Sequence, residues 1–267
     1  MKITSSNNDK IKYLRSLYQK KYRRENNQFV LEGIRLIEEA LQEKIGVQQV
    51  FYSEYLLRNE QGENLFKELQ QLSGVNIYEI DDNLLQQVAD TVSPQGVLAI
   101  ADKVEYQLDD ILGAKHQLVL VIDQIQDPGN LGTIIRTADA AGFDGLITTK
   151  GTVSLYNQKT IRATMGSFFR TPIAKVNDLT EFKKAITASD FNLVVADTAG
   201  ETYHFEIDYL PATAIIVGNE AHGPRQELID LADQSIKIPL LGGAESLNVA
   251  MATSVIAYEA VRQKLDS

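Results

Sequence analysis

The sequence contains no cysteine and only three histidines among its 267 residues. Without cysteine there can be no disulfides, thiolate nucleophiles or cysteine-based zinc sites, and three scattered histidines do not form a metal cluster. No stretch approaches the roughly 20 apolar residues of a membrane span, and the N-terminal segment lacks the apolar core of a secretory signal. We therefore expect a soluble, cytoplasmic protein without a metal or a membrane partner, whose chemistry depends on other side chains.

Two nucleotide-binding fingerprints are also missing. The segment after the first apolar strand of the C-terminal half, residues 123–142, contains neither the G-x-G-x-x-G spacing of dinucleotide sites nor the G-x-x-x-x-G-K of P-loops. This removes the main support for a nicotinamide cofactor or a nucleoside triphosphate.

The charge is unevenly distributed along the chain. The net charge is −10, yet residues 1–26 carry eight basic and two acidic residues, a net of +6 that leaves −16 on the remainder. Such a basic arm is either the solvated face of an amphipathic helix or a surface that contacts phosphates. Arg23 and Arg24 are our candidate phosphate contacts in this arm.

The apolar pattern predicts two domains after the arm. In the first, residues 27–103, the spacing of Ile34, Ile37 and Leu41 predicts a helix in segment 29–42, and further helices and strands alternate up to a closing strand at 96–102. This alternation is typical of a small α/β domain. Polar residues 104–116 form the expected linker, with the boundary near Lys115.

The second predicted domain covers residues 117–267. Buried apolar strands are expected at 118–123, 145–149, 171–176, 193–197, 214–218 and 235–240, with helices between them and a final helix at about 247–264. Continuous apolar strands that alternate with helices indicate a parallel sheet covered on both faces. Ligands bind such sheets beyond the carboxyl ends of the strands, so the loops after Asp123, Asp197, Gly218 and Leu240 are the candidate site.

Three of these loops carry suitable side chains. In the first, Asn130 is an expected helix N-cap and Arg136 lies near the second turn of that helix; an ordinary capped helix with a solvated arginine is the alternative. In the second, Gly218 would let a ligand approach the backbone and Glu220 could orient a hydroxyl or a cation, although an ordinary strand-to-helix turn has the same pattern.

In the third loop, we expect Ser246 to cap the final helix and Asn248 to lie in its first turn, where unpaired N–H groups favour a polar ligand. Local turn chemistry alone would also explain these two residues.

Together the loops are more specific than any one alone. N-x-G-x-x-x-R-T-A from Asn130, G-N-E at 218–220 and S-L-N-V-A from Ser246 resemble the three motifs of the SpoU-type, or TrmH-like, RNA ribose 2'-O-methyltransferases of the SPOUT superfamily. The resemblance covers about residues 117–264, and FVLEGIRLIEEAL and SPQGVLAIA resemble the family's substrate-binding domain. Ala221 and Pro224 depart from the family pattern in the second motif, which puts the local loop shape in doubt.

The resemblance implies a deep trefoil knot in the C-terminal domain, a homodimer, and S-adenosylmethionine as cofactor. It assigns the cofactor to Gly218, Ile238 and Leu247, with Thr198 and Leu240 as further contacts. It assigns catalysis to Arg136, Asn130, Glu220, Ser246 and Asn248. Because a guanidinium stays protonated in proteins, we expect Arg136 to bind the phosphate beside the target ribose and to steady oxyanion charge rather than to act as a base.

The implied substrate is structured RNA. Lys159, Arg162 and Arg170 are candidate RNA contacts of the catalytic domain, unless Arg162 and Arg170 form salt bridges within it, and the basic arm supplies a second basic surface. The expected activity is methyl transfer to a ribose 2'-hydroxyl of ribosomal RNA of the 23S type. Transfer RNA as the substrate, or an inactive RNA-binding ribosome assembly factor, are the alternatives. The second and third motifs favour ribose over base methylation.

Overall fold

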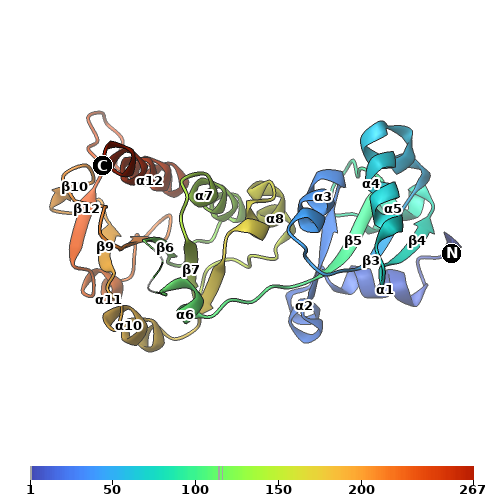
Figure 1. The fold of residues 1–267 in the computed structure, drawn as a ribbon, viewed down its shortest axis with the longest axis horizontal. Helices are drawn as coiled ribbons and strands as arrows, with labels where there is room; N and C mark the ends of the chain where they lie inside the picture. Colours follow the sequence, from blue (N-terminus) through green and yellow to red (C-terminus); the bar gives the residue numbers. More distant parts are fainter. Residues whose placement is uncertain (1, 114, 116) are drawn as a thin grey trace. The chain divides into compact units, whose positions relative to one another are not determined.

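The computed structural model describes residues 2–113, 115 and 117–267. The chain divides into two compact units: unit 1 comprises residues 1–104 and 156–158, and unit 2 comprises residues 105–155 and 159–267 (Figure 1). Within the described residues, no helix is both long enough and apolar enough to cross a membrane.

Unit 1 is built on a five-stranded sheet. Its spatial order is β1 (Lys2–Ile3), β4 (Asn76–Ile80), β3 (Val47–Tyr52), β5 (Val97–Asp102) and β2 (Gln28–Glu32). β5 is antiparallel to β2 and β3, whereas β1, β3 and β4 are parallel. The helices are α1 (Asp9–Ser16), α2 (Lys20–Asn26), α3 (Ile34–Gln42), the 3-10 helix η1 (Glu54–Arg58), α4 (Glu60–Gln71) and α5 (Asp82–Val88).

The basic N-terminal segment belongs to this unit, so the predicted separate arm at 1–26 is wrong. β1 pairs with β4, and α1 buries Ile11 and Leu14 in the same core as strand residues Val30 and Phe51. One face of the helix is apolar, and burying it gains more than leaving the segment free in water. The basic side chains of α1, Lys10, Lys12 and Arg15, are not part of this core.

Segment 29–42 is a strand followed by a helix. The predicted helical spacing holds only from Ile34 onward, because Gly33 turns the chain with a φ of 103° between β2 and α3. A positive φ is accessible to glycine at little cost, which explains the change of direction at this residue.

Unit 2 contains the predicted parallel sheet. Its seven strands lie in the order β10 (Thr202–Tyr203), β12 (Gln234–Lys237), β9 (Asn192–Ala196), β11 (Thr213–Val217), β6 (Leu118–Ile122), β7 (Gly145–Thr149) and β8 (Ile173–Val176). All neighbouring pairs are parallel. The short edge strand β10 was not predicted.

Helices cover both faces of this sheet. Alternate residues of β6 point to opposite sides: Leu118 and Leu120 join one core, and Val119 and Val121 join the other. The first face is covered by α7 (Pro128–Ala140) and α12 (Val249–Asp266), which lie side by side in Figure 1. The second is covered by α6 (Leu108–Ile111), α10 (Leu179–Thr187) and α11 (Gln226–Ile229). The remaining helices are α8 (Gln158–Thr164) and α9 (Ser167–Arg170).

The predicted linker at 104–116 is largely part of unit 2, which begins at Glu105. Ile111 of α6 is fully buried in the second core. Only a few side chains of this segment are buried, and for that reason its sequence pattern predicted a linker. Lys115, near which the domain boundary was predicted, also lies within unit 2.

Candidate active site

Three polar side chains join the three predicted loops. The Asn248 side-chain amide donates to Asn130 Oδ1 at 3.0 Å, and the Asn130 amide donates to Glu220 Oε1 at 3.1 Å. These residues follow β12, β6 and β11 in the chain, and those strands end at the same edge of the parallel sheet. The network connects segments that are about 90 to 118 residues apart in the sequence.

Glu220 is the centre of this network. Its carboxylate also accepts the backbone N–H groups of Gln126, at 3.0 and 3.2 Å, and Asp127, at 3.0 Å. Partial burial alone would raise the pKa of Glu220, but the hydrogen bonds from Asn130, Asp127 and Gln126 outweigh it and lower the pKa below the usual value. Glu220 is therefore ionised at neutral pH and holds the first loop in place.

The caps of the two helices differ from the predictions. α7 begins at Pro128, and its N-cap is Asp127, whose Oδ1 accepts the N–H of Asn130 at 2.9 Å. Asn130 is therefore inside the first turn, where its side chain is free to bridge Glu220 and Asn248. Arg136 accordingly falls later in α7 than predicted.

At α12, the N-cap is Asn248, not Ser246. Its side-chain oxygen accepts the N–H groups of Ala250 and Met251 at 2.9 and 3.3 Å, while its amide nitrogen reaches Asn130. One side chain thus begins the helix and fixes the network. Ser246 is left without a capping role and lies beside the neighbouring pocket.

A pocket of about 430 Å³, open to solvent, lies at the same edge of the sheet. Four of the five predicted cofactor residues line it, together with Ser246: Thr198, Ile238, Leu240 and Leu247. The rest of the wall is mainly apolar with two charged groups, and it consists of Ala196, Asp197, Ile236, Lys237, Ala252 and Ile256. A mainly apolar lining with a few polar groups is typical of a small-molecule site.

Gly218 does not line this pocket. A Cβ atom at this position would lie 2.0 Å from the backbone nitrogen of Pro224 and 2.2 Å from the carbonyl carbon of Gly223. The chain's own turn, rather than a ligand, therefore requires glycine here, and Pro224, which departs from the family pattern, is part of that turn.

Comparisons with known proteins agree with this geometry. Residues 117–258 match the SpoU rRNA Methylase family, and residues 8–99 match the MRM3-like substrate binding domain. The chain is 35% identical to the 23S rRNA (guanosine(2553)-2'-O)-methyltransferase RlmP of Bacillus subtilis, over 96% of this chain and 97% of that protein. The chain belongs to the SpoU methylase family.

Solved structures support the same assignment for both units. An AdoMet-bound rRNA methyltransferase from Sinorhizobium meliloti has a TM-score of 0.88 and 34% identity, and the match covers 98% of this chain and 97% of that one. AviRb, a SpoU methyltransferase from Streptomyces viridochromogenes in complex with AdoMet, has a TM-score of 0.88 and 27% identity, covering 98% and 100%. The fold is thus that of a SPOUT methyltransferase with a small N-terminal domain; the knot stays a prediction.

In this SpoU-family chain, Arg136 is exposed on α7. The structure shows no hydrogen bond or ion pair between its guanidinium and another described residue. All of its donors are therefore available to a ligand.

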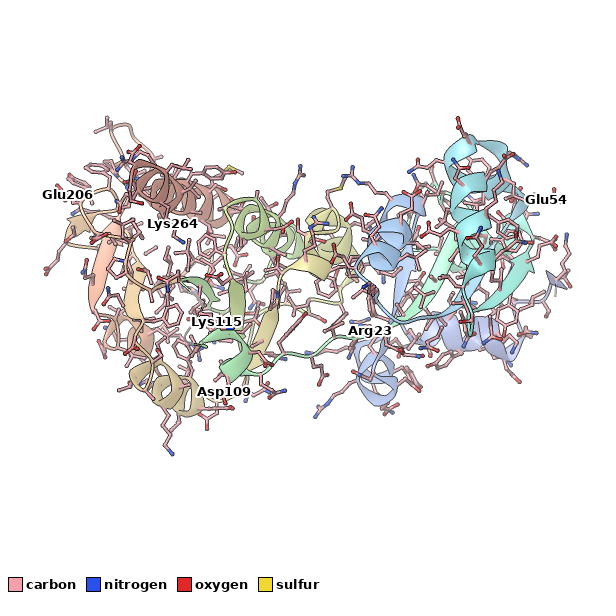
Figure 2. The ribbon with its side chains drawn as sticks, in the orientation of Figure 1. Arg23, Glu54, Asp109, Lys115, Glu206 and Lys264 are labelled. Carbon is pink, nitrogen blue, oxygen red and sulfur yellow. The ribbon has the colours of Figure 1, made fainter. Side chains whose placement is uncertain are left out.

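Several predicted RNA contacts are used within the protein. Arg23 is buried, and its guanidinium donates to the carbonyl oxygens of Leu17, at 3.0 Å, and Tyr18, at 2.5 Å (Figure 2). Its burial lowers its pKa. Arg23 therefore has a structural role, whereas the adjacent Arg24 is exposed.

The candidates in unit 2 are also engaged. Arg170 forms an ion pair with Asp139 at 2.9 Å, which is the salt bridge within the domain that was the alternative to RNA contact. Lys159 pairs with Asp127 at 3.2 Å. The backbone N–H of Asn130 lowers the pKa of Asp127 most, and the bond from Lys159 lowers it further. Arg162 is half-buried. An RNA phosphate would have to compete with these partners.

Sequence reasoning missed an ion pair that supports the site. The buried Asp123 carboxylate accepts from Arg225 Nη2 at 2.5 Å and Nε at 3.0 Å, from the Arg225 backbone N–H at 3.0 Å, and from the Thr149 hydroxyl at 2.7 Å. It ties the second loop to the ends of β6 and β7. The available signal was an aspartate directly after five buried apolar residues, because such a carboxylate requires a partner.

Proposed function

We propose that this protein transfers a methyl group from S-adenosylmethionine to a ribose 2'-hydroxyl of large-subunit ribosomal RNA. The observation that carries the proposal is the Asn248–Asn130–Glu220 network at the same sheet edge as a pocket lined by Thr198, Ile238, Leu240 and Leu247. The names of the relatives support the ribosomal substrate, since the Bacillus subtilis protein is a 23S rRNA 2'-O-methyltransferase. Transfer RNA is the alternative substrate.

The pocket suits S-adenosylmethionine. Ile236, Ile238 and Leu247 offer apolar contacts for a purine ring, and Asp197 offers a carboxylate that would accept from ribose hydroxyls. When bound, the cofactor supplies an electrophilic methyl group on a sulfonium. The residues of this chain then have to bring the target hydroxyl into line and exclude wrong orientations.

Positioning is the main task of the polar network. A ribose 2'-hydroxyl is a very weak acid, so orientation of the nucleophile supplies much of the rate gain. We assign Asn130, Glu220 and Asn248 to ordering the loops around it. Ser246, on the pocket wall, would bind a polar group of the cofactor or the nucleotide.

Arg136 is the residue that we expect to contact the substrate. Its guanidinium is planar, permanently charged and without a protein partner among the described residues. It would bind the phosphate next to the target ribose in a bidentate manner and stabilise negative charge on the 2'-oxygen as the hydroxyl proton passes to solvent water. It does not need to act as a base.

We also propose that the protein is a homodimer. Met251, Val255 and Tyr258 are 54%, 40% and 51% exposed along one face of α12, at spacings of four and three residues. An apolar stripe of this kind on a long helix is typical of a protein interface. Sedimentation analysis is expected to give twice the chain mass, and Val255→Asp is expected to give the monomer.

The test of the function is transfer of labelled methyl to total RNA from cells that lack this protein, followed by separation of ribosomal and transfer RNA and mapping of ribose products. We expect label at a ribose of large-subunit ribosomal RNA. Arg136→Lys keeps the charge but loses the planar fork, and we expect it to reduce turnover by about 100-fold or more. Arg15→Lys, an exposed arginine of α1, is the control.

Each other outcome has a defined meaning. Label confined to transfer RNA would replace the substrate but keep the chemistry. Absence of cofactor binding would favour the inactive assembly factor. Near-normal turnover of Arg136→Lys would contradict the role proposed for this arginine.

A further inference from the structure

One edge of the sheet in unit 1 presents three neighbouring segments. β2 and β3 both run antiparallel to β5, so the residues that follow β2 and β3 lie at the same edge as those that precede β5. These segments are the start of α3, the helix η1, and residues 90–95, which we call the 90–95 loop. None of them was assigned a role by the motifs of the catalytic domain.

The 90–95 loop is tied to the sheet by buried groups. Glu32, only 6% exposed, accepts the backbone N–H groups of Asp90 and Thr91 at 2.8 and 3.1 Å, and also the Thr91 hydroxyl. At the other end, Gln95 Oε1 accepts the N–H of Ile34 at 2.9 Å. A buried carboxylate is costly unless it is hydrogen-bonded, so these bonds from Asp90 and Thr91 both satisfy Glu32 and fix the start of the loop.

The tip of this firmly held loop is an apolar side chain in water. Val92 is 89% exposed, the most exposed large hydrophobic residue described in unit 1. A loop that served only to connect α5 with β5 would need neither the buried anchor nor an exposed valine. The arrangement is that of a side chain presented to a partner.

The flanking segments offer an aromatic ring and cations. Tyr55 of η1 is 47% exposed, and the Arg58 guanidinium lies over its ring with the carbon 5.3 Å from the centroid. The Asp82 carboxylate pairs with Arg58 at 3.2 Å, which holds the arginine plane and neutralises its charge in part. On the other side of the loop, Arg35 is exposed in the first turn of α3, without a partner among the described residues.

We propose that Arg35, Tyr55, Arg58 and Val92 bind an unpaired segment of the RNA substrate. Flat aromatic and guanidinium groups stack on bases only when those bases are splayed out of a helix, and Val92 can insert beside such a base. Arg35 would contact the adjacent phosphate. Because Asp82 offsets Arg58, the surface lacks the broad positive charge that duplex binding requires. This inference rests on the proposed function, since it names the RNA feature that unit 1 selects.

The test measures RNA binding directly by the full chain, without cofactor, using protein-free transcribed large-subunit ribosomal RNA in filter binding. We expect Tyr55→Ala to raise the Kd by about tenfold through the loss of one stacked base. We expect Arg35→Glu to raise the Kd by about tenfold because it replaces a phosphate contact by a like charge. The matched control is Lys44→Glu, which makes the same change of charge at the opposite end of α3 on another exposed cation. Leu72→Ala, 37% exposed after α4, controls for loss of a surface side chain.

A hairpin with an unpaired loop is expected to compete better than its stem as a blunt duplex. The proposal would be overturned if Arg35→Glu and Lys44→Glu weakened RNA binding equally, or if Arg35→Glu or Tyr55→Ala left the Kd unchanged. Equal competition by the hairpin and the duplex would also overturn it. Thermal unfolding of each variant, followed by circular dichroism, serves as the folding control. If the wild type binds RNA at this surface but transfers no methyl, the proposed function fails while this inference stands.

Discussion

Replacement of Glu220 by glutamine tests the central network with a minimal change of shape. In the wild type, Glu220 Oε1 accepts from Asp127 N at 3.0 Å, Asn130 Nδ2 at 3.1 Å and Gln126 N at 3.2 Å, and Oε2 accepts from Gln126 N at 3.0 Å. A glutamine keeps one acceptor oxygen but turns the second into a donor that faces another donor. The remaining bonds lose their ionic character.

The expected size of the effect follows from these contacts. A hydrogen bond to a charged group contributes about 1.5–3 kcal/mol, and the lower value applies because Glu220 is exposed at its edge. A loss of about 1.4 kcal/mol in transition-state stabilisation is tenfold in rate. We therefore expect Glu220→Gln to lower kcat/KM about tenfold and Glu220→Ala, which also releases Asn130, to lower it about 100-fold.

The assay is single-turnover transfer of labelled methyl to the RNA fraction identified above, with cofactor affinity measured by calorimetry. Glu227→Gln in α11 removes the same charge from an exposed glutamate outside the network and serves as the control. Wild-type turnover in Glu220→Gln, or an equal loss in Glu227→Gln, would refute the reasoning.

Three further predictions concern the scaffold of the site. Gly218→Ala should lower the free energy of unfolding by about 1–3 kcal/mol, seen in urea denaturation, because its Cβ would clash with Pro224; an unchanged midpoint would contradict this. Arg225→Ala should cost about 3 kcal/mol by the same measurement, because it leaves the buried Asp123 carboxylate without its ionic partner, whereas a loss below about 0.5 kcal/mol would show that the pair contributes little. The folded state lowers the pKa of Glu220, so its contribution to stability is full above the unfolded pKa of about 4.3 and is lost as pH falls through the folded value. The difference in melting temperature between wild type and Glu220→Gln should thus be constant from about pH 6 to 8 and vanish in acid, and a change between pH 6 and 8 would exclude this origin.

The sequence by itself determined the family and the α/β class of the two units, and it named candidate residues for the site. Buried strands such as 118–122 are continuous runs of apolar residues because helices cover both faces of the sheet, and that pattern is visible without coordinates. Asn130, Glu220 and Asn248 were identified because they lie in loops that follow such strands and because the three loops together resemble the motifs of the family. The structure adds that these three side chains are hydrogen-bonded to one another.

Only the tertiary structure decided which partner each polar group has. Arg23 and Arg24 are adjacent and chemically alike, yet one is buried against backbone carbonyls and the other is exposed. Asp127 and Asn248, rather than Asn130 and Ser246, cap their helices because a cap depends on the φ and ψ of one residue, which neighbouring residues of similar chemistry do not reveal. The Asp123–Arg225 pair joins residues 102 positions apart. The periodicity of apolar residues indicates which side chains are buried. Hydrogen-bond partners instead depend on which distant segments come together, and the packing of the whole sheet decides this.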